Sequence, residues 1–449
     1  MALTEELATF CTTLRYEEIP AAALPFIRIG FTDCVATLVA GRYSEPVRIL
    51  KETLEPAPGE SRLLLDLGTA RAPDAARLNA TAAHALDFDD ATLKGHLSAV
   101  LVPAILAEAD ACGASGRQMM TAYAAGYETW GELLRREPDL YHNQSWHPTG
   151  VLGPLAVAAA CSSLRGLDAR RATHALAIAA SQSAGLIANF GSMTKPFHAG
   201  QASQAGVLSA RLAARGFTGS PEALEHPKGL MQGISPNRRV DLASSSDAGR
   251  QWKLPVEGVN TKKYPTCFAS HRATDGMLSL VDEHAIEAGD VERVVVTISR
   301  RNKSTLRFER PDDALQAKFS MQFAMAAALI ERRCTLHELR DEFVNRDDVR
   351  QLMSRVEVLP EDRQDPLRPG EAPHDVVIVE TRDGRRFTRE VAYVRGGPEL
   401  PLLPGELFAK FESCLAAGKL QAEPRPLFDA LMSVDALRST AELYELAGS

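Results

Sequence analysis

Apolar side chains recur every three to four residues through the first half of the chain, a spacing typical of helices that bury one face. After two prolines, the first long apolar segment ends near Ala40. Later segments with this spacing, many of them rich in alanine, are residues 73–86, 116–134, 150–164, 168–187 and 201–214. Asp168 is expected to cap a helix and Gly216 to end one. Because small side chains let helices approach closely, we predict an all-helical domain over residues 1–262.

The pattern changes after about residue 258, where short runs rich in β-branched residues appear. The strands expected from these runs are residues 292–299, 355–359, 375–381 and 386–394. The helices expected between them are residues 272–285 and 316–332. The dipeptide Asp383-Gly384 is typical of a tight hairpin turn. Strands mixed with helices predict a smaller α+β domain over residues 263–396, and helical spacing then returns, so residues 397–449 are expected to rejoin the helical domain.

Composition excludes some classes of partner. The net charge is -8, whereas a surface that binds nucleic-acid phosphates is normally basic, so no nucleic acid is expected. The seven cysteines are scattered without a C-x-x-C pair, which indicates a reducing compartment. The first 18 residues do not have the pattern of a signal peptide, and apolar runs such as residues 99–107 are too short to span a bilayer. We therefore expect a cytoplasmic protein without a membrane partner.

A cluster of ionisable residues runs from His84 to His96 and includes Asp87, Asp89 and Asp90. His84 and Asp87 are three residues apart, so they are expected to share one face of a helix. Carboxylates this close repel one another, which predicts that at least one is paired or has a shifted pKa. A solvated helix end is the alternative. An acidic magnesium-binding motif is disfavoured, because Leu93 stands where a further acid would be needed.

Two further candidates lie at predicted helix starts. His147, in Trp-His-Pro-Thr-Gly, would have its pKa lowered by the helix dipole and act as a neutral base. Lys195, in Lys-Pro-Phe-His-Ala-Gly with His198, would form an anion site suited to a carboxylate. The alternatives are a packing histidine and a solvated lysine, respectively.

The last group lies at the predicted domain junction, where clefts tend to form. Lys263, His271 and Arg272 would supply cations and a titratable ring there. Cys267 lies between them, but nothing in the sequence indicates a lowered pKa, so a buried thiol is preferred to a nucleophile.

No G-x-G-x-x-G follows a predicted strand, and no phosphate loop, H-E-x-x-H or G-x-S-x-G motif is found, so nucleotide, flavin, zinc and serine-hydrolase chemistry are unsupported. Histidines, a lysine and carboxylates remain, a set suited to proton abstraction next to a carboxylate.

Together these segments resemble the MmgE/PrpD family over nearly the whole chain. The matching segments are Asp87-Phe-Asp-Asp with His96, Trp146-His-Pro-Thr-Gly, Lys195-Pro-Phe-His-Ala-Gly, Gly216-Phe-Thr-Gly, Lys263-Tyr-Pro-Thr-Cys with His271, Lys318-Phe-Ser, and Gly397-Pro with Lys410-Phe411. The family includes 2-methylcitrate dehydratases, cis-aconitate decarboxylases and iminodisuccinate epimerases. The resemblance implies a helical domain with a smaller lid domain, a homodimer, and an active site between the domains without metal or cofactor.

By motif, the resemblance places catalytic roles on a small set of residues. These are Asp87, His96, His147, Lys195 and His271. Lys195 and His271 would hold carboxylates, one of His96 and His147 would act as base and the other as acid or anchor, and Asp87 would orient a histidine. The expected substrate contacts are Lys263, Arg272, Thr92 and His198.

We expect a cofactor-independent lyase, a dehydratase or decarboxylase of a small polycarboxylic acid. An epimerase or racemase of a dicarboxylate would use the same residues, and a non-catalytic carboxylate-binding protein is a further alternative. The sequence departs from the family pattern at Ala91, where threonine is common, at Leu97, where proline is usual, and at Phe323, where tyrosine is frequent. Two hydroxyl groups are therefore missing, which predicts altered substrate recognition.

Overall fold

The computed structural model describes residues 2–366, 368 and 370–448. It divides into a helical unit, formed by residues up to 261 together with those from 403 onward, and a mixed unit, residues 262–402. The boundaries expected from the sequence fell after residues 262 and 396. The first unit is mainly helical and the second combines helices with a four-stranded sheet, which confirms the predicted fold class.

The helical unit is built mostly from long helices. Its helices are α1 (Leu3–Thr13), α2 (Leu24–Gly41), α3 (Glu45–Leu54), α4 (Ala72–Ala85), α5 (Leu97–Cys112), α6 (Gly116–Arg135), α7 (Pro148–Leu164), α8 (Ala169–Ala180), α9 (Thr194–Ala214), α10 (Leu230–Ile234), α11 (Leu254–Glu257), α18 (Pro404–Ala417), α19 (Pro424–Leu431) and α20 (Ala441–Leu446). The short helices α10 and α11 lie in an irregular stretch that follows α9. Strands β1 (Ser61–Arg62) and β2 (Thr69–Ala70) form a small antiparallel pair. As predicted, the Asp168 side chain caps α8, and Gly216 follows α9 with a positive φ of 90°.

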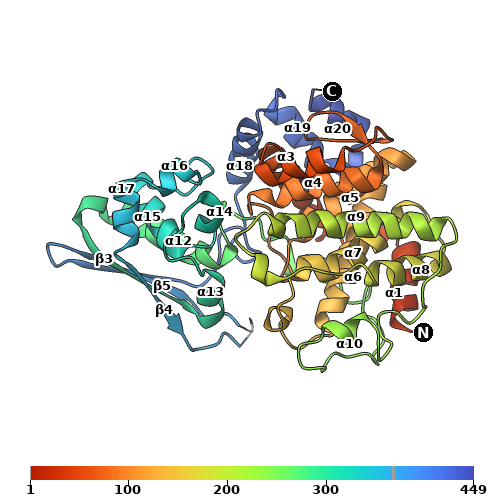
Figure 1. Ribbon diagram of the computed structural model, residues 1–449, viewed down its shortest axis with the longest axis horizontal. Helices are drawn as coiled ribbons and strands as arrows, with labels where there is room; N and C mark the ends of the chain where they lie inside the picture. The colour runs from red at the N-terminus through yellow and green to blue at the C-terminus, as the bar shows by residue number, and fades with distance from the viewer. Residues whose placement is uncertain (1, 367, 369, 449) are drawn as a thin grey trace. The chain divides into compact units, whose positions relative to one another are not determined.

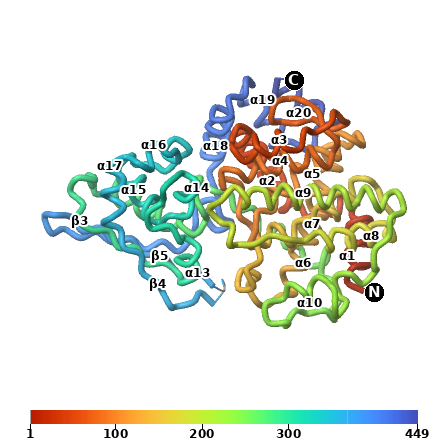
Figure 2. Tube along the Cα trace, viewed as in Figure 1, coloured from red at the N-terminus to blue at the C-terminus, as the bar shows by residue number. Residues whose placement is uncertain are grey.

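Helix α9 packs against both α4 and α7, and Figure 2 shows it between their labels. Glycines allow the close approach: a Cβ atom on Gly200 would lie 2.1 Å from Thr81 Oγ1, and one on Gly206 would lie 2.4 Å from Val157 Cβ. Small residues therefore bring the first turn of α9 close to the end of α4, and this approach determines where Lys195 and His84 lie.

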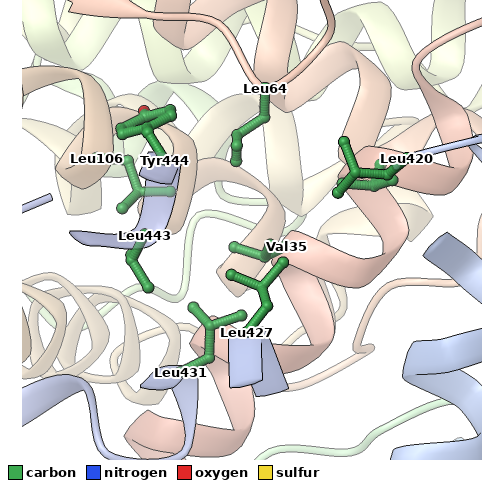
Figure 3. Close-up of a pocket in the computed structure, with 9 residues that line it drawn as sticks. Val35, Leu64, Leu106, Leu420, Leu427, Leu431, Leu443 and Tyr444 are labelled. Carbon is green, nitrogen blue, oxygen red and sulfur yellow. The ribbon is translucent and has the colours of Figure 1, made fainter. Parts of the chain in front are cut away.

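The C-terminal helices, blue in Figure 1, pack on the N-terminal ones, with α18 and α19 against α2. Buried Lys410 on α18 forms an ion pair of 2.5 Å with buried Asp33 on α2, and its Nζ donates a hydrogen bond to the Phe88 carbonyl oxygen at 2.8 Å. Leucine and valine side chains from α2, α5, α19 and α20 surround an apolar void of about 10 Å³, roughly the room of one water molecule (Figure 3). Residues from both ends of the chain thus share one core.

Replacing Lys410 by methionine is expected to lower the free energy of unfolding by about 3–5 kcal/mol, because buried Asp33 would lose its counter-charge. Urea denaturation would measure the change. The surface pair Lys51–Asp66, with both side chains 41% exposed, offers the control: Lys51→Met should change stability by less than about 1 kcal/mol. Equal effects of the two substitutions would contradict the expectation.

Helix α2 corrects one expectation from the sequence. It has 18 residues and a mean hydropathy of 1.4, so by length and composition it is long enough to cross a membrane, the one such helix in the described part of the chain. However, 67% of it is buried inside the protein, as in an ordinary core helix. The expectation that apolar segments are too short was therefore wrong for α2, but its burial gives a structural reason for its composition.

The mixed unit contains a sheet with the strand order β4-β3-β5-β6. Its strands are β3 (Val291–Ser299), β4 (Val356–Glu361), β5 (Asp375–Thr381) and β6 (Arg386–Val391). Its helices are α12 (His271–His284), α13 (Arg300–Thr305), α14 (Ala314–Ala317), α15 (Met321–Glu331), α16 (Asp341–Val344) and α17 (Asp347–Met353). The hairpin β5–β6 turns at Gly384, with a φ of 84°, as predicted, whereas β4 pairs with β3 in parallel.

Candidate active site

The site in the helical unit starts at the end of α4. This helix ends at Ala85, and Asp87 follows it with a φ of 52°, a conformation that aspartate tolerates better than most residues. The expectation that His84 and Asp87 share one helix face is therefore wrong, because Asp87 lies outside the helix. The reversal of the chain instead directs both side chains to the same lysine.

Lys195 lies in the first turn of α9 and is buried. Its Nζ lies 2.8 Å from Asp87 Oδ1 and 2.8 Å from His84 Nε2. An ammonium group can only donate hydrogen bonds, so the unprotonated Nε2 of His84 accepts from it. The site thus holds an oriented cation beside a carboxylate and a neutral imidazole, instead of the solvated lysine that was the alternative.

The loop between α4 and α5 places His96 and is tied to two other helices. Trp130 Nε1 donates to the Leu93 carbonyl oxygen at 3.0 Å, and the backbone N–H of His96 donates to Thr149 Oγ1 at 3.1 Å. A Cβ atom on Gly95 would lie 2.5 Å from the Trp130 ring, so the close approach requires glycine. The His96 ring then lies with its centroid 4.1 Å from that of His84.

His147 enters from the start of α7. Its backbone N–H donates to the Gly185 carbonyl oxygen at 3.0 Å, and its ring lies 3.1 Å from His198, Nδ1 to Nδ1. Its ring centroid is 6.1 Å from that of His84 and 6.2 Å from that of His96. The structure therefore brings four histidines together with Lys195 and Asp87.

Burial shifts the ionisation of three of these histidines, His84, His147 and His198, toward the neutral form. It lowers the pKa of His84 to about 3, with Asp89 opposing and Lys195 adding to the shift. It also lowers the pKa of His147 well below 6.5 and that of His198 to about 4, in both cases with Lys195 adding to the effect. The lowered pKa of His147 agrees with the sequence prediction, but burial is its main cause. Neutral imidazoles at neutral pH can accept protons.

The same side chains are close enough to surround a metal ion. The groups His84–His96–His147 and His84–Asp87–Asp89–His96 each have ligand atoms within 4.8 Å of one another. However, both ring nitrogens of His84 are engaged by Lys195 and Asp89, and the Lys195 ammonium lies beside Asp87. A metal ion would break these hydrogen bonds and meet a like charge. The arrangement therefore fits an anionic ligand better than a metal.

Asp90, beside this cluster, has a different environment from Asp87 and Asp89. Burial raises the pKa of Asp90 to about 7, with the Ser98 hydroxyl opposing and the nearby Asp89 and Asp33 adding to the rise. This agrees with the prediction that one of the clustered carboxyl groups has a shifted pKa.

Replacing Asp90 by asparagine is expected to stabilise the protein more at pH 8 than at pH 5. The pKa of Asp90 in the folded state, about 7, lies above the ordinary aspartate value of 3.8, so between these values the folded state holds a proton that the unfolded state has lost. The free energy of unfolding therefore falls as pH rises toward 7. The free energy of unfolding of the variant, relative to that of the wild type, should rise by about 2–3 kcal/mol from pH 5 to pH 8. Urea unfolding at both pH values measures it, and a pH-independent difference would contradict the prediction.

Thr92 is placed differently from the residues of the cluster. It is buried, and its hydroxyl accepts a hydrogen bond from the backbone N–H of Asn260 at 2.9 Å. This contact anchors the loop, so the role of Thr92 in substrate binding stays a prediction.

Three other predicted site residues belong to the mixed unit. The Arg272 guanidinium lies 3.1 Å from Asp375 and 3.3 Å from Glu371, and it donates a hydrogen bond to the Ala372 carbonyl oxygen. These contacts stabilise the mixed unit. The Lys263 ammonium lies 3.8 Å from Asp275.

His271 is fully buried, and its Nε2 donates to the Thr266 carbonyl oxygen at 3.2 Å.

Phe323 is buried on α15 and packs edge-on against Phe343. Cys267 is half-buried, so the expected buried thiol is only partly covered. The predicted catalytic role of His271 and the predicted substrate contacts of Lys263 and Arg272 stay predictions.

Sequence reasoning did not single out His84 and Asp89 as site residues. His84 contacts Lys195, and the fully buried Asp89 carboxylate lies 2.9 Å from Nδ1 of both His84 and His96. The density of charged residues between 84 and 96 was a signal for this segment, but it did not show which side chains face one another.

Comparison with known proteins agrees with the predicted resemblance and with the fold. Residues 5–243 match the MmgE/PrpD N-terminal domain and residues 264–425 match the MmgE/PrpD C-terminal domain. The chain belongs to the MmgE/PrpD family. Among curated relatives, the human cis-aconitate decarboxylase is 30% identical over 353 residues, covering 76% of this chain and 72% of that one. The mouse enzyme of the same name is 28% identical over 351 residues, covering 76% and 71%, and that of Aspergillus terreus is 23% identical over 478 residues, covering 99% and 95%.

Proposed function

We propose that this protein is a lyase that acts on a small polycarboxylic acid by proton transfer at a carbon next to a carboxylate. The observation that carries the proposal is the buried Lys195 ammonium, which is held by Asp87 and His84 beside the neutral imidazole of His147. A fixed cation in a water-poor site stabilises negative charge that develops on a substrate. A neutral imidazole nearby can take up or deliver a proton.

The proposed chemistry divides the work between these groups. Lys195 binds a substrate carboxylate and stabilises the charge that develops during reaction. In a decarboxylation, His96 or His147 first takes up a proton from solvent and then delivers it to the carbanion that the departure of carbon dioxide leaves. In a dehydration, one of the two removes a proton next to a carboxylate, and the other, already protonated from solvent, gives its proton to the departing hydroxyl, which leaves as water. Both reactions need a base or acid within hydrogen-bonding reach of the substrate.

The names of the relatives support decarboxylation first, because the human, mouse and Aspergillus proteins are all cis-aconitate decarboxylases. Ala91, which stands where a hydroxyl-bearing side chain is common, favours a different acid of the same class, whereas Phe323 is fully buried in the core of the mixed unit and gives no such argument. We therefore propose a tricarboxylate or dicarboxylate substrate, with cis-aconitate as the first compound to test.

The test is incubation of the purified protein with cis-aconitate, 2-methylcitrate, citrate and a set of dicarboxylates, followed by proton NMR and measurement of released carbon dioxide. A new alkene with carbon dioxide supports decarboxylation, and one without carbon dioxide supports dehydration. No conversion of any acid, together with no ligand-induced rise in melting temperature, would contradict the proposal. A ligand at 100 times its Kd should add about 2.7 kcal/mol of apparent stability.

An epimerase or racemase is a second candidate, favoured by the presence of two imidazoles. The rings of His96 and His147 lie at an interplanar angle of 70°, so they can approach one substrate from different directions. Incubation in heavy water separates the possibilities, because deuterium incorporation without alkene or carbon dioxide supports epimerisation. Binding without any exchange or turnover would support a carboxylate-binding protein.

A further inference from the structure

Asp89 occupies a position that the proposed reaction does not yet explain. Its carboxylate is fully buried and lies between two imidazole rings. Oδ1 is 2.9 Å from His84 Nδ1, and Oδ2 is 2.9 Å from His96 Nδ1. One carboxylate thus contacts the histidine that holds Lys195 and also a candidate catalytic histidine.

The partners of these rings determine their protonation. Burial alone would raise the pKa of Asp89, but the two histidines lower it well below its usual value, so the carboxylate is ionised and can only accept hydrogen bonds. Both Nδ1 atoms must therefore donate to it. His84 then has its proton on Nδ1, which leaves Nε2 to accept from Lys195 Nζ at 2.8 Å. In the same way, Nε2 is the nitrogen at which His96 can exchange a proton.

We infer that Asp89 is a positioning residue that fixes the Nδ1–H form of both His84 and His96. Through His84 it also holds Lys195, because the other tautomer of His84 would point an N–H group at the ammonium. In His96 it binds Nδ1–H, so the nitrogen that is left to exchange a proton is Nε2. The effect on catalysis rests on the proposed function. The tautomers of the two rings follow from their hydrogen-bond partners alone.

The variant Asp89→Asn is the direct test. Asparagine has one accepting oxygen and one donating NH₂ group, so at least one of the two rings would face a donor and change tautomer. Asp90→Asn is the matched control, since Asp90 is equally buried and adjacent, and its side chain has no hydrogen bond to a histidine among those described. When the carboxylate that orients a catalytic histidine is replaced by an amide, the histidine takes the wrong tautomer, and kcat can fall by up to about 10⁴-fold.

The measurements are ring-nitrogen NMR of protein labelled with ¹⁵N-histidine and steady-state kinetics. Signals of His84 and His96 are assigned from His84→Gln and His96→Gln. In wild type we expect both rings to have protonated Nδ1 and His84 to have unprotonated Nε2. In Asp89→Asn we expect at least one ring to change and kcat to fall at least roughly tenfold, with a smaller change in KM. Asp90→Asn should keep the wild-type spectrum.

Two outcomes separate this inference from the proposed function. A wild-type spectrum in which Nδ1 of either ring is unprotonated would overturn the inference whatever the activity, and this measurement does not require Asp89→Asn to fold. Unchanged tautomers and unchanged kcat in Asp89→Asn would also overturn it. The expected spectra in a protein that converts no carboxylic acid would instead support the tautomer assignment and contradict the proposed lyase.

Discussion

Replacing Lys195 by methionine is expected to lower the turnover of the polycarboxylate substrate by roughly 10²–10³-fold. Methionine keeps much of the length of the side chain but removes the positive charge that Asp87 and His84 hold in place. That charge would stabilise the electron density developing beside a carboxylate, so its loss should reduce kcat as well as binding. Steady-state kinetics with the acid that the conversion assay identifies as substrate would measure both.

The stability of this variant has to be measured as well, because the buried Asp87 loses a cation and breaking such a pair can cost about 3–5 kcal/mol. The double substitution Asp87→Asn with Lys195→Met should recover part of the stability but none of the activity. Lys228→Met, at an exposed lysine of the same unit, serves as the control and should leave both unchanged. Full activity of Lys195→Met would refute the electrostatic role.

Replacing His147 by glutamine is expected to reduce kcat by roughly 10²–10⁴-fold, the usual contribution of a positioned acid or base. Glutamine keeps a hydrogen-bonding side chain at the start of α7 but cannot take up a proton. Because burial lowers the pKa of His147 well below 6.5, the wild-type ring remains a neutral base as pH falls through that value. The measurement is kcat of the wild type and the variant between pH 6 and pH 8.

His174→Gln provides the comparison, since His174 is half-buried on α8 and its Nδ1 contacts Gly219. This control should retain full kcat. If His147→Gln and His174→Gln behaved alike, His147 would be a packing residue, the alternative that its sequence context left open.

Much of the fold was predictable because periodic apolar segments are local features. Helix α6 and strand β5 lie almost where the pattern placed them. Helix α5 was not assigned, since it is apolar and buried on all sides from Leu97 to Ala109 and contains Pro103, so it shows no polar face. Helix α8 ends at Ala180, before the predicted residue 187, because the chain turns to pair Gly185 with His147. The parallel pairing of β3 with β4 joins distant segments and has no local signal.

The site was predictable as a set of residue types but not as a network. Lys195 and His147 stand at predicted helix starts, which made them candidates. The link from His84 through Asp89 to His96 depends on a loop with positive φ values at Asp87, Leu93 and Lys94, none of which is glycine. Backbone conformations of this kind are uncommon for such residues, so no pattern in the sequence predicts them.

The pairing of Asp33 with Lys410 has a consequence for how the protein is made. The two residues are separated by the entire mixed unit, so a ribosome must translate residues 262–402 before the partner of Asp33 exists. Until then the face of α2 that α18 and α19 cover stays open to solvent. We expect the nascent chain to display this apolar surface to chaperones until its last helices emerge, and the N-terminal portion alone to aggregate when it is released early.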